Sequence, residues 1–237
     1  MLRIDILVLV TMWSLILNIT DDHVVTNGGN MPTRLFFELS TDKKAQIVDA
    51  GISEFSEYGY ENSSTNRIVK KSGISKGSLF KYFSTKEDLY FFLLDTVITE
   101  LTESLEKDAA DLSTKLFQRV IEYSVLEFSW YIKNPEKSRL VIGAFVKRDT
   151  EIYRKTIERY GLIESDIYYK FLENVDLSSF RGDRKKTVDI LKWFLKGFND
   201  DFLQHIQINN SSFESLRHEY VRSLTEHMEI LKNGLWK

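Results

Sequence analysis

Apolar residues recur every three or four positions through most of the chain, which is the spacing of amphipathic α-helices. In the first such stretch, Ile47, Gly51, Phe55 and Tyr58 fall on one stripe. No alternation of period two persists long enough to predict a strand, and only two prolines interrupt the chain. The longer helices are predicted at 40–58, 112–133, 136–147, 150–174, 183–207 and 212–233. The sequence therefore predicts an all-α protein.

Between the first of these helices and the second, the sequence predicts two short helices and then a longer one, and residues typical of helix ends mark their boundaries. Two helices are predicted at 65–72 and 76–83, and Gly59 and Gly73 stand where a helix end needs a left-handed residue. A further helix is expected to follow and to continue past Leu105. The residues expected to cap these helices are Ser63 or Ser64, Ser75 and Thr85. The pattern predicts a small module of short helices ahead of a larger helical region.

The charge of the chain is unevenly distributed. The formal net charge is −3, but residues 61–86 hold six cations and one anion, a local net charge of +5. The apolar fraction of 43% is that of a packed globule. The absence of cysteine excludes disulfides and thiolate metal sites, and suits a reducing cytoplasm. A basic stretch in an otherwise acidic protein confines the attraction for phosphate to one face.

The helix predicted at 76–83 has two distinct sides. At about 100° per residue, Leu79, Phe80 and Phe83 cluster on one side and are expected to pack against the two preceding helices. The other side carries a small residue, a hydroxyl, a cation and a phenol, namely Gly77, Ser78, Lys81 and Tyr82. These groups can approach a base edge or donate to phosphate. A helix-turn-helix presents its recognition helix to the major groove in this way.

The order and spacing of these residues resemble the DNA-binding region of the TetR family of bacterial transcriptional regulators. The resemblance extends from Lys43 to Leu93 and is carried by AQIVDAGISEFSEYGY and by GYENSSTNRIVKKSGISKGSLFKYFSTKEDLYFFLL. It implies a three-helix DNA-binding domain, a fourth connecting helix and a variable helical ligand-binding domain. It also implies a homodimeric cytoplasmic repressor that a small molecule releases from its operator.

The resemblance also assigns positions in this chain to DNA contacts. The family's DNA-contacting positions fall on Thr65, Ser75, Lys76, Gly77, Ser78, Lys81, Tyr82 and Lys86. Many members have tyrosine where this chain has Phe80, so a phosphate contact from that hydroxyl is absent here.

Three segments are expected along the chain. They are an N-terminal extension at 1–39, a helix-turn-helix domain at 40–87, and a helical effector-binding and dimerisation domain at 88–237. The apolar stretch from Ile6 to Ile19 is shorter than the about 20 residues that a bilayer span needs. One interpretation takes Met31 as the natural start. Two other interpretations take residues 4–19 as a membrane anchor or as an extra packing helix. No membrane association is expected unless these residues are an anchor.

The larger domain is rich in aromatic residues, which suggests a pocket for a small lipophilic or aromatic effector. A core built from bulky residues is the alternative for each of them. The residues selected as candidate ligand contacts are Phe128, Tyr131, Phe145, Tyr168 and Trp193. The two helices within 183–233 are expected to pair with their copies in a homodimer, although packing within one chain would give the same spacing.

No arrangement of residues in the sequence predicts catalysis, a cofactor or a metal. There is no Ser-His-Asp order, no paired catalytic carboxylates and no phosphate-binding glycine loop with its Gly-Lys-Ser/Thr ending. The pairs Asp201–His205 and Glu214–His218 are more typical of solvated ion pairs than of metal ligands. Two rivals to an effector-released repressor stay open. One is a DNA-binding regulator controlled by a protein partner; the other is a helical enzyme or lipid-binding protein.

Overall fold

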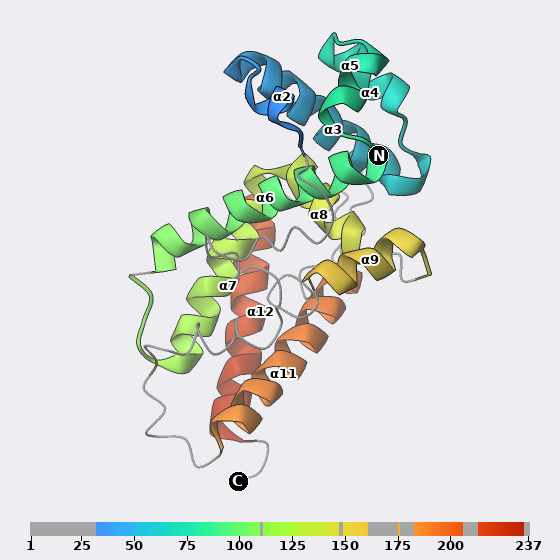
Figure 1. The fold of residues 1–237 in the computed structure, drawn as a ribbon. Helices are drawn as coiled ribbons and strands as arrows, with labels where there is room; N and C mark the ends of the chain where they lie inside the picture. Colours follow the sequence, from blue (N-terminus) through green and yellow to red (C-terminus); the bar gives the residue numbers. More distant parts are fainter. Residues whose placement is uncertain are drawn as a thin grey trace. The chain divides into compact units, whose positions relative to one another are not determined.

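The computed structural model describes residues 32–109, 111–146, 149–160, 175, 183–205 and 213–234. These residues form helices and no β-sheet, which confirms the predicted all-α class (Figure 1). The helices are α2 (Arg34–Phe37), α3 (Thr41–Asn62), α4 (Thr65–Ser72), α5 (Lys76–Tyr82), α6 (Lys86–Ala109), α7 (Leu116–Lys133), α8 (Pro135–Val146), α9 (Glu151–Tyr160), α11 (Arg184–His205) and α12 (Phe213–Asn233).

Each helix predicted from the sequence has a counterpart among these elements, with two differences. The helix predicted at 150–174 is described only as far as Tyr160, as α9. The four-residue helix α2 was not predicted, because it is too short to show a period. No helix in the described part of the chain is long and apolar enough to cross a membrane, and Ile6 to Ile19 lie outside that part.

The chain divides into two compact units. The N-terminal unit comprises Ile19–Glu100 and Asn134–Thr156, and the C-terminal unit comprises Met1–Asn18, Leu101–Lys133 and Ile157–Lys237. Helices α6 and α9 therefore contribute residues to both units. The unit that contains the short helices is larger than the expected range of 40–87, because it also includes α8. The domain boundaries expected from the sequence stay a prediction.

In the N-terminal unit, α3 is the helix against which α4 and α8 pack. Its N-cap is Ser40, whose side chain accepts a hydrogen bond from the Lys43 backbone N–H at 3.4 Å. Gly59 has φ 68° and ψ 174°, which are not helical angles, so the regular helix is interrupted where the sequence predicts its end, and a short helical segment follows the kink as far as Asn62. Gly51 lies where a Cβ atom would be 2.5 Å from Leu93 Cδ1, so α3 and α6 approach closely at that point.

Polar contacts hold α8 and α9 to the other helices of the N-terminal unit. Lys137 of α8 donates to Glu100 Oε1 of α6 at 2.6 Å, and Lys155 of α9 donates to Glu87 Oε2 at 2.7 Å. Both pairs are partly exposed, so each contributes at most about 1 kcal/mol to stability. They connect α8 and α9 to α6.

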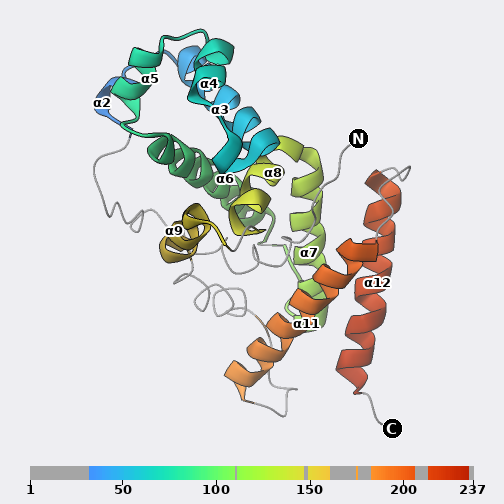
Figure 2. The same cartoon turned by 90° about the vertical axis from the view of Figure 1, so that its right-hand side faces the viewer.

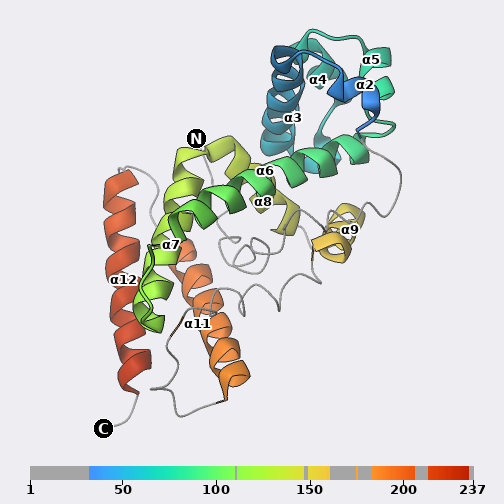
Figure 3. The ribbon, with the colours of Figure 1, turned by 60° about the vertical axis from the view of Figure 1, so that its left-hand side comes forward.

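The C-terminal unit has an aromatic core that is shared by three helices. Tyr220 of α12 stacks on Phe128 of α7 with ring centroids 4.8 Å apart. The same tyrosine meets Phe198 and Phe202 of α11 at 5.6 and 5.1 Å. All four rings are buried, and α7 and α12 lie side by side (Figure 3). Much of the apolar stripe predicted on α11 is therefore used for packing within the chain.

Candidate functional sites

The basic module of the N-terminal unit is a helix-turn-helix formed by α4 and α5 (Figure 2). The turn between them depends on Gly73, which has φ 63° and closes α4 as predicted. Ser64 is the N-cap residue of α4, but its side chain makes no capping hydrogen bond. Instead, the buried carboxylate of Glu54 accepts from the Ser64 backbone N–H at 2.7 Å. Glu54 thus ties the start of α4 to α3.

The two sides of α5 are buried and exposed largely as the sequence predicts. Leu79 and Phe83 are 1% and 0% exposed. On the opposite side, Lys76, Gly77 and Lys81 are exposed, and Ser78 and Tyr82 are half-buried. Phe80 is the exception: it was expected to pack inside, but it is 39% exposed. Its position on the seven-residue helix lies between the buried and the exposed side, and a hydroxyl there would reach solvent.

The start of α5 is fixed by a pair of serines. Ser75, the N-cap residue, accepts a hydrogen bond from the Ser78 backbone N–H at 3.0 Å, as predicted. The two hydroxyl oxygens are also 2.8 Å apart and share a hydrogen bond. Ser75 is exposed, so its hydroxyl is accessible to solvent while it holds the helix start in place.

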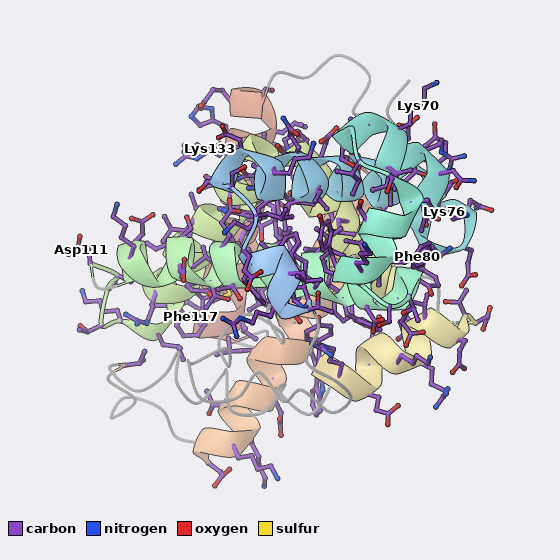
Figure 4. The ribbon with its side chains drawn as sticks, turned by 45° about the horizontal axis from the view of Figure 1, so that its top comes forward. Lys70, Lys76, Phe80, Asp111, Phe117 and Lys133 are labelled. Atoms are coloured by element: carbon purple, nitrogen blue, oxygen red, sulfur yellow. The ribbon has the colours of Figure 1, made fainter. Side chains whose placement is uncertain are left out.

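Half of the cations counted in this stretch have partners within the protein. Arg67 pairs with Glu54 and its guanidinium lies 4.2 Å from the ring centre of Tyr58, while Lys71 donates to Ser53 at 2.6 Å. Lys70, Lys76 and Lys81 are exposed, and Figure 4 shows Lys70 and Lys76 on the outer sides of α4 and α5. The cations available to a phosphate are therefore fewer than the local net charge suggests.

Lys86, which the family resemblance assigns to a DNA contact, is also held by the protein. Its ammonium donates to the Tyr60 carbonyl at 2.7 Å and lies 4.4 Å from the centre of the Tyr60 ring. It is half-buried. This lysine therefore links the start of α6 to the end of α3. A contact between its ammonium and a phosphate would require the ammonium to leave the Tyr60 carbonyl and ring.

The segment just before α3 also contacts α5, and no pattern in the sequence predicts this contact. Thr33 donates two hydrogen bonds to carbonyl oxygens of α5: its hydroxyl to Lys81 at 2.7 Å and its backbone N–H to Tyr82 at 2.9 Å. Phe36 of α2 is 2% exposed and its ring lies 5.1 Å from that of Phe83. Thr33 and Lys81 are 48 positions apart, and the spacing of apolar residues within a helix gives no information about contacts over such a distance.

A second unusual group lies in the C-terminal unit, on the buried side of α7. Glu127 is 2% exposed, and Tyr131 donates to its Oε1 at 3.4 Å. Burial raises the pKa of Glu127 to about 8, and the hydrogen bond from Tyr131 only partly opposes that shift. One turn away, the buried hydroxyl of Ser124 has no hydrogen-bond partner among the described residues. At neutral pH this face therefore presents an uncharged carboxyl group and an unpaired hydroxyl.

The five candidate ligand residues lie in different parts of the chain. Phe128 and Tyr131 lie on α7 in the core of the C-terminal unit, whereas the buried Phe145 belongs to the N-terminal unit. Trp193 is 71% exposed on α11, which does not fit a place in an enclosed pocket. Tyr168 lies outside the described residues.

A separate cleft of about 630 Å³ opens between the outer faces of α7 and α12. Its lining includes the apolar residues Ile121, Val125 and Val221 and the cations Arg217 and Arg222. None of the four described candidate ligand residues lines it. Within the ranges that the structure describes, no three His, Asp or Glu side chains are grouped to hold a metal ion.

Comparison with known proteins supports the identification of the helix-turn-helix. The family model described as "Bacterial regulatory proteins, tetR family" matches residues 47–91, which run from α3 into α6. The chain is also similar to the HTH-type transcriptional repressor AcnR of Corynebacterium glutamicum. The two are 24% identical over 178 residues, which cover 73% of this chain and 86% of AcnR.

Two solved structures share the fold. A TetR family transcriptional regulator from Chloroflexus aurantiacus matches with a TM-score of 0.60 and 22% identity, over 86% of this chain and 98% of that one. The regulator FadR from Bacillus subtilis, solved in complex with stearoyl-CoA, matches with a TM-score of 0.52 and 18% identity, over 76% and 97%. At these identities the structures establish the similarity of fold alone.

The raised pKa of Glu127 predicts a pH-dependent stability. In the unfolded chain this carboxyl group ionises near pH 4.5 and in the folded protein near pH 8, so the folded state holds the proton more tightly. Stability therefore falls as the pH rises through this window, by up to about 1.4 kcal/mol per pH unit. The side chain of Glu127→Gln is neutral in the folded and the unfolded state. The melting temperature of this variant, relative to that of the wild type, should therefore rise as the pH increases from about 5 to about 8.

Thermal unfolding followed by circular dichroism across this pH range measures the effect. The exposed carboxylate of Glu103 on α6 provides the control, because Glu103→Gln removes a charge without emptying a buried site. A difference between Glu127→Gln and wild type that stays constant with pH would contradict the prediction.

Proposed function

We propose that this chain, which belongs to the TetR family of bacterial transcriptional regulators, is a dimeric repressor that a small lipophilic or aromatic effector releases from its operator. Members of the family are DNA-binding regulators and not enzymes. A repressor of this kind acts in the cytoplasm, where it reaches the chromosome. The similarity to AcnR, which is named a repressor, supports the sign of the regulation.

The observation that carries the DNA-binding part is the orientation of α5. Its apolar residues Leu79 and Phe83 are buried, so the side that carries Gly77, Lys81 and Tyr82 faces outward. We propose that this side enters the major groove, with Ser75, Lys76 and Ser78 at the helix start and Thr65 on α4 as further contacts. Lys86 is a weaker candidate, since its ammonium is bound to the Tyr60 carbonyl.

We propose that dimerisation uses the outward face of α11 together with α12. Ile190 and Trp193 are 48% and 71% exposed, which is unusual for large apolar side chains. Gly197 follows on the same stripe, and apart from its chain neighbours and the adjacent backbone of α11 no described atom lies within 4 Å of the position of its missing Cβ, so another helix could approach closely there. Ile230 of α12 is also half exposed. In a dimer the two recognition helices would reach major grooves about 34–36 Å apart.

The proposed effector site is the core of the C-terminal unit on the buried side of α7. Phe128 and Tyr131 supply aromatic surface, and Ser124 and Glu127 supply a hydroxyl and an uncharged carboxyl group. Such a lining suits a mainly apolar molecule with one polar group. The fold neighbour FadR, solved with stearoyl-CoA, supports a lipophilic ligand in a protein of this fold. The alternative is a regulator that responds to a protein partner instead.

The side of α5 that carries Gly77, Lys81 and Tyr82 is called the reading face, and its proposed contact with DNA predicts the effect of two substitutions. Genomic fragments retained by the protein at low salt would first supply an operator-containing duplex. Lys81→Ala should lower the affinity for this duplex about tenfold and reduce the slope of log K against log salt by about 0.9, because one phosphate contact is lost. Tyr82→Phe should lower the affinity less, since only a hydroxyl is removed. Fluorescence anisotropy at several salt concentrations measures both quantities.

Lys133→Ala is the matched control, because Lys133 is an exposed lysine at the end of α7, far along the chain from α5. Its affinity and salt slope should equal those of the wild type. An unchanged slope in Lys81→Ala would remove this lysine from the proposed interface.

The proposed dimer face predicts a change in oligomeric state. Trp193→Glu places a charge at the centre of the exposed apolar stripe of α11 and should raise the dimer dissociation constant at least about tenfold. Sedimentation equilibrium measures this constant. Ile157→Glu serves as the control, since Ile157 is 38% exposed on α9. Equal dissociation constants for the two variants would place the interface elsewhere.

The proposed effector site predicts which compounds release the protein from DNA. Stearoyl-CoA and uncharged long-chain alcohols are suitable probes, scored by release of the operator duplex and by the rise in melting temperature. At least one lipophilic probe should do both, and Ser124→Ala together with Glu127→Gln should weaken its effect several-fold. If no probe binds and the complex dissociates only on addition of a protein partner, the alternative regulator is correct.

A further inference from the structure

The residues just upstream of the family-model match form a contact with the recognition helix. The match begins at residue 47, whereas Thr33 and Phe36 lie more than ten positions before it. In the structure α2 lies beside α5, as Figures 2 and 3 show from two directions. The contact is therefore an addition to the part of the module that the family model covers.

The recognition helix needs support at its C-terminal end. A helix of seven residues is not stable by itself in water, and the last carbonyl groups of any helix lack partners within it. Ser75 fixes the other end of α5. At the C-terminal end, Thr33 donates its hydroxyl to the Lys81 carbonyl at 2.7 Å and its backbone N–H to the Tyr82 carbonyl at 2.9 Å. Both ends of the helix are thus held from outside.

The carbonyl groups that Thr33 holds belong to two residues of the proposed reading face. The side chain of Lys81 is exposed and that of Tyr82 is half-buried, while the backbone oxygens of both residues accept hydrogen bonds from Thr33. A movement of this backbone by a fraction of a hydrogen-bond length would displace both side chains together. The hydrogen bonds therefore restrict the position of the side chains without contacting DNA.

Phe36 fastens the same segment to the core of the N-terminal unit. Its ring is 2% exposed and lies 5.1 Å from Phe83, at the end of α5, and 5.2 Å from Phe92 of α6. It also meets the ring of Tyr82 in an edge-on arrangement at 6.2 Å. The ring of Tyr82, whose hydroxyl is proposed to donate to phosphate, therefore packs against Phe36.

We infer that the segment from Pro32 to Leu39 is a positioning element of the DNA-reading surface, in which Thr33 and Phe36 fix the end of α5 and the direction of Tyr82. The inference rests on the proposed use of α5 to read DNA. It assigns a function to a segment that precedes the helix-turn-helix. Thr33 and Phe36 are positioning residues, and neither is a DNA contact.

The test compares two substitutions of Thr33 in the full-length chain. Thr33→Val has nearly the same shape but cannot donate to the Lys81 carbonyl, whereas Thr33→Ser retains the hydroxyl. Each is titrated with the genomically selected duplex and with a random-sequence duplex of equal length. Thr33→Val should lose about fivefold in affinity for the selected duplex and little for the random one, and Thr33→Ser should restore the wild-type ratio.

Amide hydrogen exchange supplies a second readout that does not depend on DNA. In Thr33→Val the amides of α5 should exchange faster while those of α3 and α6 keep their protection. Phe36→Leu keeps an apolar side chain in the core and should likewise lower the ratio of the two affinities. Equal affinity ratios in wild type, Thr33→Val and Phe36→Leu would overturn the inference. Failure of the wild type to bind either duplex at low salt would instead overturn the proposed function.

Discussion

A seven-residue helix cannot keep its position by its own hydrogen bonds, so everything proposed for α5 depends on the burial of Leu79 and Phe83 behind it. These two side chains are removed from water almost completely, which contributes about 1.5–3 kcal/mol for each. Their burial decides which side of the helix remains for another molecule. The caps at its two ends, Ser75 and Thr33, then limit how far it can tilt or unwind.

Charge is divided between holding the module together and attracting a partner. Arg67, Lys71 and Lys86 hydrogen-bond to other groups of the N-terminal unit, where they join α4 and α6 to α3. Arg67 and Lys71 are also exposed. The ammonium groups of Lys70, Lys76 and Lys81, by contrast, are exposed and have no hydrogen-bond partner among the described residues. The salt dependence of binding should therefore reflect about three lysines of this stretch and not all six of its cations. The distinction depends on three-dimensional contacts, which a count of charges does not contain.

The features that could be predicted from the sequence are those with a local cause. The helical period indicated the all-α class, and Gly73 and Ser75 marked the turn and the start of α5 because a left-handed residue and a cap have specific chemistry. The helical wheel predicts that Phe80 is buried, but this residue is 39% exposed. The prediction is wrong because a helical wheel does not show how wide the buried side of a helix is. No local pattern marks Thr33, Phe36 or Glu127, because their importance comes from neighbours distant in sequence or from burial, and none predicts the exposure of Trp193.

One continuous helix, α6, has residues in both units of the chain. At 1.5 Å per residue its 24 residues span about 36 Å. It starts at Lys86, immediately after the turn that follows the recognition helix, and its first turn is fixed by reciprocal hydrogen bonds between Thr85 and Asp88. Because α6 is one helix, no loop separates the residues that follow the helix-turn-helix from the first residues of the C-terminal unit. α6 is therefore the direct covalent connection between the helix-turn-helix and the unit that contains α7, α11 and α12.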